Sequence, residues 1–399
     1  MINRTAKSLA AVAALVLWSM TLASPVIAES IKVGAILPLT GKLAKFGEIE
    51  EKSFLMAVDE INSAGGINGK KIELIIEDTT GKPDIGRSAI EKLISRDKVC
   101  IVGGGYSSSV TWASVAVAQQ HKVPFLVNTG SADKITEQGW EYIFRLNPPV
   151  SEYPEALSSF LLAVARVKNV AILYENTLFG QSGSKQFNSQ CKRIGLKVLM
   201  KEGYESGAID FTPLLIKVKS KNPDLIYMIS YVMDAALLIR QSRELNLSPK
   251  LFVGGAAGFT LPEFRKNTGD ASEYVFSATL WTPSVPYPGA KAYYDNFVNK
   301  YGSPTEYHGA EAYAAMYVIA DALKRTKSFS PQDVRKALSE TDMMTAFGPV
   351  KFISYGKKAQ QNKLPTFLVQ WINGKLETVW PKSIATSKYV YPVPKWTER

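Results

Sequence analysis

The chain has 399 residues, 46% of them hydrophobic, which is enough to build the cores of two globular domains. Its formal net charge is +11, but the basic residues are scattered and are not interleaved with aromatic residues, which argues against a nucleic-acid groove. With two cysteines and two histidines the sequence offers no metal-site spacing, and no cofactor is expected.

Residues 1–28 have the pattern of a secretory signal peptide. A basic start at Arg4 and Lys7 precedes an apolar stretch, 9–17, and small residues then lead to a cleavage site after Ala28. Polar residues and Pro25 interrupt the apolar run before it reaches the roughly 20 residues of a membrane span. We therefore expect a periplasmic protein that begins at Glu29.

Short apolar strands alternate with amphipathic helices in the first part of the mature chain. The expected strands are 31–37, 72–77, 99–103 and 123–127, then 170–174, 196–200, 224–229 and 250–253. Continuous apolar strands separated by helices predict parallel sheets with helices on both faces. Because the series restarts after Asn147-Pro148-Pro149, we predict two α/β lobes of Rossmann-like build.

The pattern changes after this second series. A strand at 274–279 is followed by helices at 289–301 and 307–325 and a shorter helix that starts at Ser330-Pro331. Two apolar segments, 367–372 and 375–380, flank Asn373-Gly374, and this pair predicts a hairpin with a type I′ turn.

The two cysteines are expected to be free. Cys100 lies in an apolar run of the first lobe, and Cys191 lies in a helical stretch of the second. An exported protein could pair them, but the bridge would tie the lobes together. Two buried thiols are therefore the better expectation.

Four loops that follow predicted strands are candidate binding segments: 37–47, 103–110, 128–133 and 174–183. Ligands of open parallel sheets bind beyond the carboxyl ends of the strands, where helix N-termini present amide donors. The second loop, Gly103-Gly-Gly-Tyr-Ser-Ser-Ser-Val110, has Ser108 where a dinucleotide fingerprint needs its third glycine, and it lacks a phosphate-loop lysine. Its serines either cap the following helix or bind an anion.

Several motifs, in a fixed order along nearly the whole mature chain, indicate a resemblance to a known protein family. The motifs are Ile31-Lys-Val-Gly-Ala-Ile-Leu-Pro-Leu-Thr-Gly with Phe46-Gly47, Ala64-Gly-Gly-Ile-Asn-Gly69, Gly105-Tyr-Ser-Ser-Ser109, Thr129-Gly-Ser-Ala-Asp-Lys-Ile-Thr136, Phe179-Gly180 and Glu311-Ala-Tyr-Ala-Ala315. The chain resembles the branched-chain amino-acid-binding (Leu/Ile/Val-binding-like) family of periplasmic proteins, which have the type I fold and serve ABC transporters.

The resemblance implies two lobes joined by a three-crossing hinge, with crossings near Asn147, near Ala278 and near 348–352. The first lobe would then comprise 29–147 plus 279–350, and the second 148–278 plus 351–399. It also implies a monomer that captures a small molecule by closure of the lobes and delivers it to an inner-membrane ABC permease. A binding partner of a sensor or receptor would have the same fold.

The resemblance places the ligand carboxylate at Tyr106-Ser107, with help from the loop that follows the fourth strand, and aromatic side chains around the rest. The complete set of candidate ligand-binding residues is Phe46, Tyr106, Ser107, Ser108, Gly130, Ser131, Ala132, Phe179, Tyr231, Ala256 and His308. Tyr307 and Trp281 could also line such a pocket.

The candidate set departs from the family at Ala256, where members that bind α-amino acids often place an acidic side chain against the ammonium group. An ammonium group buried without a carboxylate is costly. Asp133 or Asp234 could substitute, although such residues more often cap helices or lie at the surface. The expected ligand is therefore an aromatic or aliphatic carboxylate, or a small amide, rather than a simple aliphatic amino acid.

An exported enzyme is the remaining alternative. A serine hydrolase needs a base, yet neither histidine belongs to a recognisable motif, and Gly180-Gln-Ser-Gly183 is not a nucleophile elbow. Paired carboxylates of a glycosidase stay open, because their separation is invisible in a sequence. No catalytic residues are predicted, and we expect binding without a covalent step.

Overall fold

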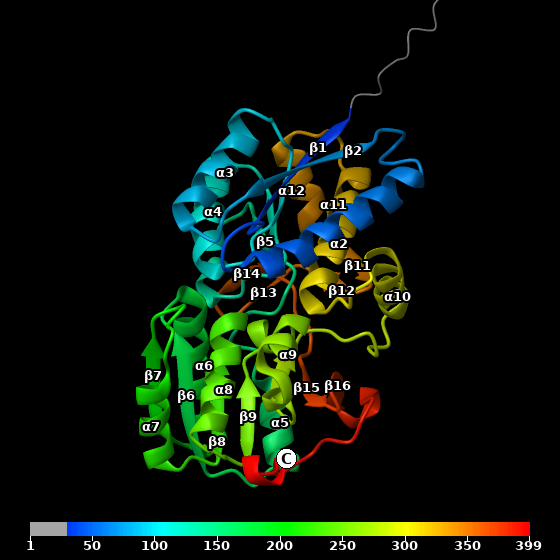
Figure 1. Ribbon diagram of the computed structural model, residues 1–399. Helices are drawn as coiled ribbons and strands as arrows, with labels where there is room; N and C mark the ends of the chain where they lie inside the picture. Colours follow the sequence, from blue (N-terminus) through cyan, green and yellow to red (C-terminus); the bar gives the residue numbers. More distant parts are fainter. Residues whose placement is uncertain (1–29) are drawn as a thin grey trace, which may run out of the picture.

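The first lobe is built around a seven-stranded sheet (Figure 1). Its strands are β1 (Ile31–Leu37), β2 (Ile72–Asp78), β3 (Val102–Gly104), β4 (Phe125–Val127), β5 (Ile143–Arg145), β13 (Ile353–Tyr355) and β14 (Lys358–Gln361). They are ordered β13-β14-β5-β4-β3-β1-β2, and all neighbours pair in parallel except β13 with β14. The computed structural model describes residues 30–399, so the predicted signal peptide, 1–28, lies outside the described residues.

Helices cover both faces of this sheet. They are α2 (Ala44–Ser63), α3 (Pro83–Ser95), α4 (Ser108–Gln120), α10 (Ala290–Tyr301), α11 (Tyr307–Arg325) and α12 (Pro331–Ser339). α2 and α11 pack against each other on one face, and α3 and α4 pack together on the other. A small ribbon of β11 (Asp342–Thr345) and β12 (Gly348–Lys351) follows α12.

The second lobe repeats this plan with another seven-stranded sheet. Its strands are β6 (Asn169–Glu175), β7 (Lys197–Tyr204), β8 (Leu225–Ile229), β9 (Leu251–Gly254), β10 (Phe276–Thr279), β15 (Phe367–Ile372) and β16 (Lys375–Trp380). The order is β16-β15-β10-β9-β8-β6-β7, with β15 and β16 antiparallel to their neighbours. The helices are α5 (Glu155–Ala163), α6 (Leu178–Arg193), α7 (Thr212–Lys221), α8 (Val232–Glu244) and α9 (Pro262–Thr268). The predicted fold class, two α/β lobes with largely parallel sheets, is confirmed.

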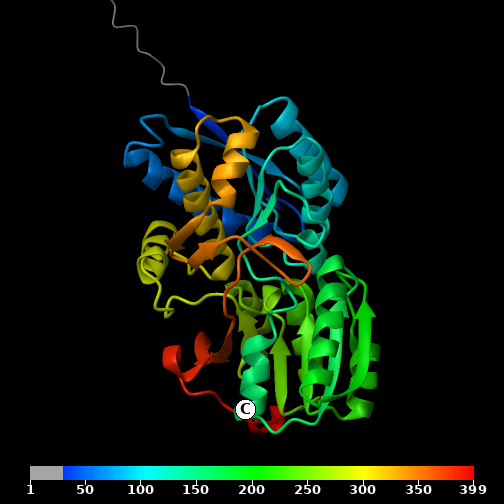
Figure 2. The same cartoon turned by 180° about the vertical axis from the view of Figure 1, so that it is seen from behind.

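The chain passes between the two sheets three times, as the views from the front and from behind show (Figures 1 and 2). The first passage follows β5 and the second follows β10. The expectation for the third was wrong, because it lies between Gln361 and Phe367 and not near 348–352. Strands β13 and β14 therefore belong to the first sheet, although residues from 351 onward were assigned to the second lobe.

A buried polar network holds β14 in the first sheet. The Arg145 guanidinium is fully buried and donates through Nε to the Gln361 side-chain oxygen. The Gln361 amide donates to the Asn147 carbonyl at 2.7 Å, and the Asn362 amide donates to the Leu146 carbonyl at 3.1 Å. Because side-chain amides and not apolar residues fix this strand, hydrophobic periodicity gave no sign of it.

The C-terminal hairpin forms as predicted. Asn373 and Gly374 both have positive φ, 52° and 74°, as a type I′ turn requires. Both cysteines are buried and unpaired, and burial raises the pKa of each thiol to about 12. Between residues 30 and 399, no helix has both the length and the apolar character needed to cross a membrane.

Candidate ligand-binding site

Equivalent Phe-Gly pairs bring one aromatic ring from each lobe to the space between the sheets. Phe46 and Phe179 lie in the first turns of α2 and α6, each next to the strand-to-helix loop. A Cβ atom on Gly47 would lie 2.1 Å from the Pro38 carbonyl oxygen, and one on Gly180 would lie 2.0 Å from that of Glu175. Only glycine permits this close approach of helix to loop.

Around these two rings an aromatic cluster spans the lobes. Phe46 stacks on Tyr106 with centroids 4.4 Å apart, and Phe179 stacks on Tyr231 at 5.7 Å. Tyr106 and Tyr231 are 5.6 Å apart, which joins the two pairs across the cleft. His308 completes the cluster, 5.1 Å from Phe46 and 5.3 Å from Tyr106. Offset aromatic contacts of this kind bury large apolar areas at low rotamer cost.

The N-terminus of α4 supplies the anion-binding end of the cleft. Ser107 is its N-cap residue, but the Ser107 side chain makes no capping hydrogen bond, so the amides of the first helical turn keep their donor capacity. The Ser107 hydroxyl is instead a partner of the Tyr231 hydroxyl in the other lobe.

The Ser108 hydroxyl ties α4 to the loop after β4. It accepts hydrogen bonds from the Ser131 amide at 3.2 Å and from the Ala132 amide at 3.1 Å. The two amides of this loop are thus occupied within the protein. The side chain of Ser131 is a partner of the Tyr153 hydroxyl.

A small cavity of about 10 Å³, roughly the space that one water molecule needs, lies between these residues. Its lining residues are Tyr106, Ser108, Thr129, Ser131, Tyr153, Phe179, Tyr231, Ala257, Tyr307 and His308. A solute can therefore enter only when the lobes lie further apart, and the described arrangement is a closed one.

The predicted site residues fall into two groups. Six of them line the cavity: Tyr106, Ser108, Ser131, Phe179, Tyr231 and His308. The others, Phe46, Ser107, Gly130, Ala132 and Ala256, lie beside it in the aromatic cluster, the α4 cap or the two loops. Sequence reasoning missed Thr129, although it belongs to a quoted motif, and Tyr153, for which no local signal exists.

On the side of the second lobe, the backbone after β9 is unusual. Ala256 has φ 65° and ψ −144°, a region that glycine alone occupies readily, and Ala257 also has positive φ. The Ala257 amide donates to the Tyr307 hydroxyl of the first lobe at 2.9 Å. This bond and the adjoining hydrogen bond from Thr260 to Glu306, 3.1 Å, close the cleft on one side.

Neither aspartate proposed to replace the missing acid is free to do so. Asp133 forms an ion pair with Lys358 at 2.9 Å and accepts from Ser182 at 3.2 Å. Asp234 accepts from the Gly207 amide at 2.9 and 3.1 Å. Neither side chain lines the cavity.

Two buried carboxyl groups lie behind the cleft, one on each side of Thr129. The Thr129 hydroxyl is 2.5 Å from Glu50 and 2.8 Å from Glu311, and Asn128 donates to Glu50 at 2.8 Å. Burial raises the pKa of Glu50 to about 8 and raises that of Glu311 as well. Within 30–399 no three side chains gather in a manner that could hold a metal ion.

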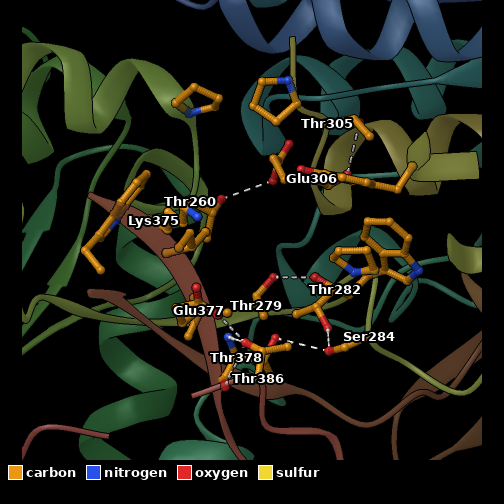
Figure 3. A pocket seen from close by; sticks show the side chains of 18 of the residues that line it. Thr260, Thr279, Thr282, Ser284, Thr305, Glu306, Lys375, Glu377, Thr378 and Thr386 are labelled. Atoms are coloured by element: carbon orange, nitrogen blue, oxygen red, sulfur yellow. Dashed lines mark hydrogen bonds between the residues drawn. The ribbon is translucent and has the colours of Figure 1, made fainter. Parts of the chain in front are cut away.

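A second cavity, of about 570 Å³, lies on the other side of the Thr260–Glu306 hydrogen bond (Figure 3). Hydroxyl groups from both the hinge and the hairpin meet there, including Thr282, Ser284 and Thr378, and they are paired with one another. Trp281 lines this second cavity and donates to the Ala346 carbonyl. Trp281, which the sequence suggested as a pocket residue, therefore lines the second cavity and not the small one.

Two α/β lobes, three chain passages and a closable cleft define a two-lobed solute-binding protein. Residues 30–375 match the family described as periplasmic binding protein, and the chain belongs to that family. The family implies a periplasmic location, and its role is binding and not catalysis, which removes the enzyme alternative.

The relatives agree with this assignment. The chain is 29% identical over 374 residues to Leu/Ile/Val-binding protein homolog 8 of Brucella abortus (strain 2308), which covers 90% of this chain and 92% of the relative. The structure is similar to that of LivJ, the branched-chain amino acid transporter substrate-binding protein of Streptococcus pneumoniae, in complex with isoleucine. The TM-score is 0.81 at 27% identity, and the alignment covers 88% of this chain and 100% of that one.

A third similarity shows the fold alone. A solute-binding protein of an ABC transporter from R. palustris in complex with benzoate has a TM-score of 0.78 and 18% identity, covering 91% of this chain and 98% of that one.

Proposed function

We propose that this protein is the substrate-binding component of an ABC importer and that it captures a small carboxylate that lacks an α-ammonium group. The observation that carries the proposal is the chemistry of the cleft. Among its ten lining residues none is an aspartate, glutamate, lysine or arginine, and the second residue after β9 is Ala256. An ammonium group bound there would find no carboxylate partner.

Three buried acids that contact lining residues are already engaged. Glu50 and Glu311 share Thr129, and Glu306 contacts His308 at 2.7 Å. The carboxylate of a ligand, in contrast, has donors: the first-turn amides of α4 and, while the lobes are apart and Tyr231 is withdrawn, the Ser107 hydroxyl. Hydrogen bonds from these donors to an anion gain from its charge. Isoleucine and benzoate, bound by the two similar proteins named above, both carry a carboxylate.

The mechanism is capture by closure. The ligand first docks on the hydrogen-bonding groups of the first lobe, and Phe179 and Tyr231 then cover it as the lobes close. The closed shape presents both lobes to the inner-membrane permease. The protein acts as a monomer after its signal peptide, 1–28, has been cleaved.

Ligand-dependent thermal unfolding tests the proposal. Protein purified from the periplasm is heated with aliphatic amino acids, aromatic and aliphatic carboxylates, small amides and polyamines. A ligand at a hundred times its Kd adds about 2.7 kcal/mol of stability. A shift with a carboxylate that lacks an amino group supports the proposal, and a shift confined to leucine-like amino acids contradicts it.

The variant Ser107→Ala tests the anion site. Loss of a hydrogen bond to a charged group costs about 1.5–3 kcal/mol, so we expect carboxylate affinity to fall about 10- to 100-fold. The unfolding temperature without ligand should change little. The variant Ser88→Ala, at an exposed serine of α3 in the same lobe, is the matched control.

A further inference from the structure

His308 is held in one orientation by the residue that begins its own helix. Glu306 is the N-cap of α11, and its Oε1 accepts from the His308 amide at 3.2 Å and lies 2.7 Å from His308 Nδ1. Its Oε2 accepts from Thr260 of the other lobe. A carboxylate at Nδ1 keeps the imidazole proton on that nitrogen and leaves Nε2 as an acceptor in the neutral ring. In the described part of the chain the imidazole hydrogen-bonds through Nδ1 to Glu306, which leaves Nε2 for a ligand.

Tyr106 presents a second unused polar atom. The side chain is 4% exposed, and its hydroxyl has no hydrogen-bond partner in the described part of the chain. The ring stacks on Phe46 and also contacts Tyr231. A buried hydroxyl without a partner is unfavourable, and native structures rarely retain one without a reason.

Both atoms belong to residues that line the same cavity, with ring centroids 5.3 Å apart. Their capacities are complementary, because the imidazole nitrogen accepts and the phenol donates. A ligand hydroxyl group uses both capacities, since it can donate to His308 and accept from Tyr106. A carbonyl or ether oxygen would leave the imidazole unpaired, and a methyl group would leave both unpaired.

We propose that Tyr106 and His308 together bind a hydroxyl group of the ligand, so that the solute is a hydroxylated carboxylate. The carboxylate part rests on the proposed function, with its anion at the α4 N-terminus, whereas the hydroxyl part rests on these two side chains alone. A site built to hydrogen-bond a hydroxyl discriminates strongly against the analogue that lacks it, because its own polar groups are then buried unpaired.

The test compares ligands in matched pairs by titration calorimetry. Carboxylate pairs are benzoate with its three monohydroxy derivatives, and 3-phenylpropionate with its 4-hydroxyphenyl analogue. Amino-acid pairs are phenylalanine with tyrosine and 2-aminobutyrate with threonine. We expect at least one hydroxylated carboxylate to bind about tenfold or more tightly than its parent. Equal affinities within every pair that binds would overturn the proposal.

Two variants assign the preference to its residues. Tyr106→Phe and His308→Phe should each abolish the preference for the hydroxylated partner and leave the affinity of the parent compound within about threefold. Tyr294→Phe, which removes a hydroxyl at the second cavity, should keep the preference. A preference that survives in Tyr106→Phe refutes the assignment. This variant removes a single unpaired oxygen, so it decides the matter even if His308→Phe fails to fold.

The pairs also separate this inference from the proposed function. Hydroxylated amino acids that bind better than their parents, with no binding of simple carboxylates, would sink the proposed ligand class and support the hydroxyl site. Carboxylates that bind equally well with and without the hydroxyl would support the proposed ligand class and contradict the hydroxyl site. No binding in either set contradicts both.

Discussion

The two carboxyl groups at Thr129 lead to a prediction about pH and stability. The Thr129 hydroxyl lies within hydrogen-bond distance of both Glu50 and Glu311, but it has a single proton. It can donate to one carboxylate only, so the other carboxyl group must itself carry a proton. In the variant Glu50→Gln the amide replaces the protonated acid, and the need for that bound proton disappears.

The size of the effect follows from the pKa of Glu50. Burial raises this pKa from 4.5 to about 8, so the folded protein retains a proton that the unfolded chain releases. The stability that Glu50 contributes is therefore fully present below pH 4.5 and is lost as the pH rises through about 8. Each pH unit in that window corresponds to about 1.4 kcal/mol, and the whole effect is on the order of 3–5 kcal/mol.

The assay is urea unfolding at pH 5, 6, 7 and 8 for the wild type and Glu50→Gln. Other buried acids contribute to the slope of both proteins, Glu175 among them with a pKa of about 8, so the difference between the two curves isolates Glu50. We expect similar stability at pH 5 and an advantage of a few kcal/mol for the variant at pH 8. Glu48→Gln, at a surface ion pair with Lys52, is the control. A difference that stays constant from pH 5 to 8 would refute the reasoning.

Three further substitutions test the backbone and the hinge. Gly180→Ala forces a Cβ against the Glu175 carbonyl, so it should lower stability by about 2 kcal/mol or more and weaken ligand binding through Phe179; unchanged unfolding and calorimetry would contradict this. Ala256→Gly relieves a backbone strain of about 1–3 kcal/mol, which outweighs the extra backbone entropy that a glycine loses on folding. The unfolding temperature should therefore rise, and a fall would show that the strain is absent. Gln361→Ala leaves Nε of the buried Arg145 guanidinium without its acceptor, while the other nitrogens keep theirs. The variant should cost about 3 kcal/mol in urea unfolding, whereas a loss under 1 kcal/mol would mean that water replaces the amide.

The sequence was a good guide where apolar periodicity and turn chemistry act locally. β1, the hairpin strands β15 and β16, and helix α11 begin and end where their patterns predict. β3 and β14 differ for physical reasons. The apolar run at 99–101 is buried and already makes backbone hydrogen bonds to β1, but the regular ladder begins only at Val102. β14 is polar and is held in the sheet by side-chain amides, so the hydrophobic periodicity of the sequence does not predict it.

The loops of the site could be located from the sequence, because parallel strands bring their carboxyl ends to one edge. Contacts between residues far apart in the sequence could not be predicted in this way. Tyr153 reaches the cleft from beyond the first chain passage, and its neighbours become known only in the folded chain. Glu50 did leave a signal, since it lies on the stripe of α2 shared by Phe46, Phe54 and Ala57, all of which are buried. An acid at a core position of an amphipathic helix indicates a buried polar network.

The two lobes share a plan, yet they divide the work at the cleft. The first lobe supplies most of the hydrogen-bonding groups there, among them the α4 amides, Ser131 and His308. The second lobe supplies Phe179, Tyr231 and Ala257, which offer mainly apolar surface. Polar groups fix the orientation of a ligand that arrives from water, while apolar burial adds free energy only once water is excluded. The residues of the cleft therefore contribute most to the free energy of binding when the ligand first docks on the first lobe and the second lobe then closes over it.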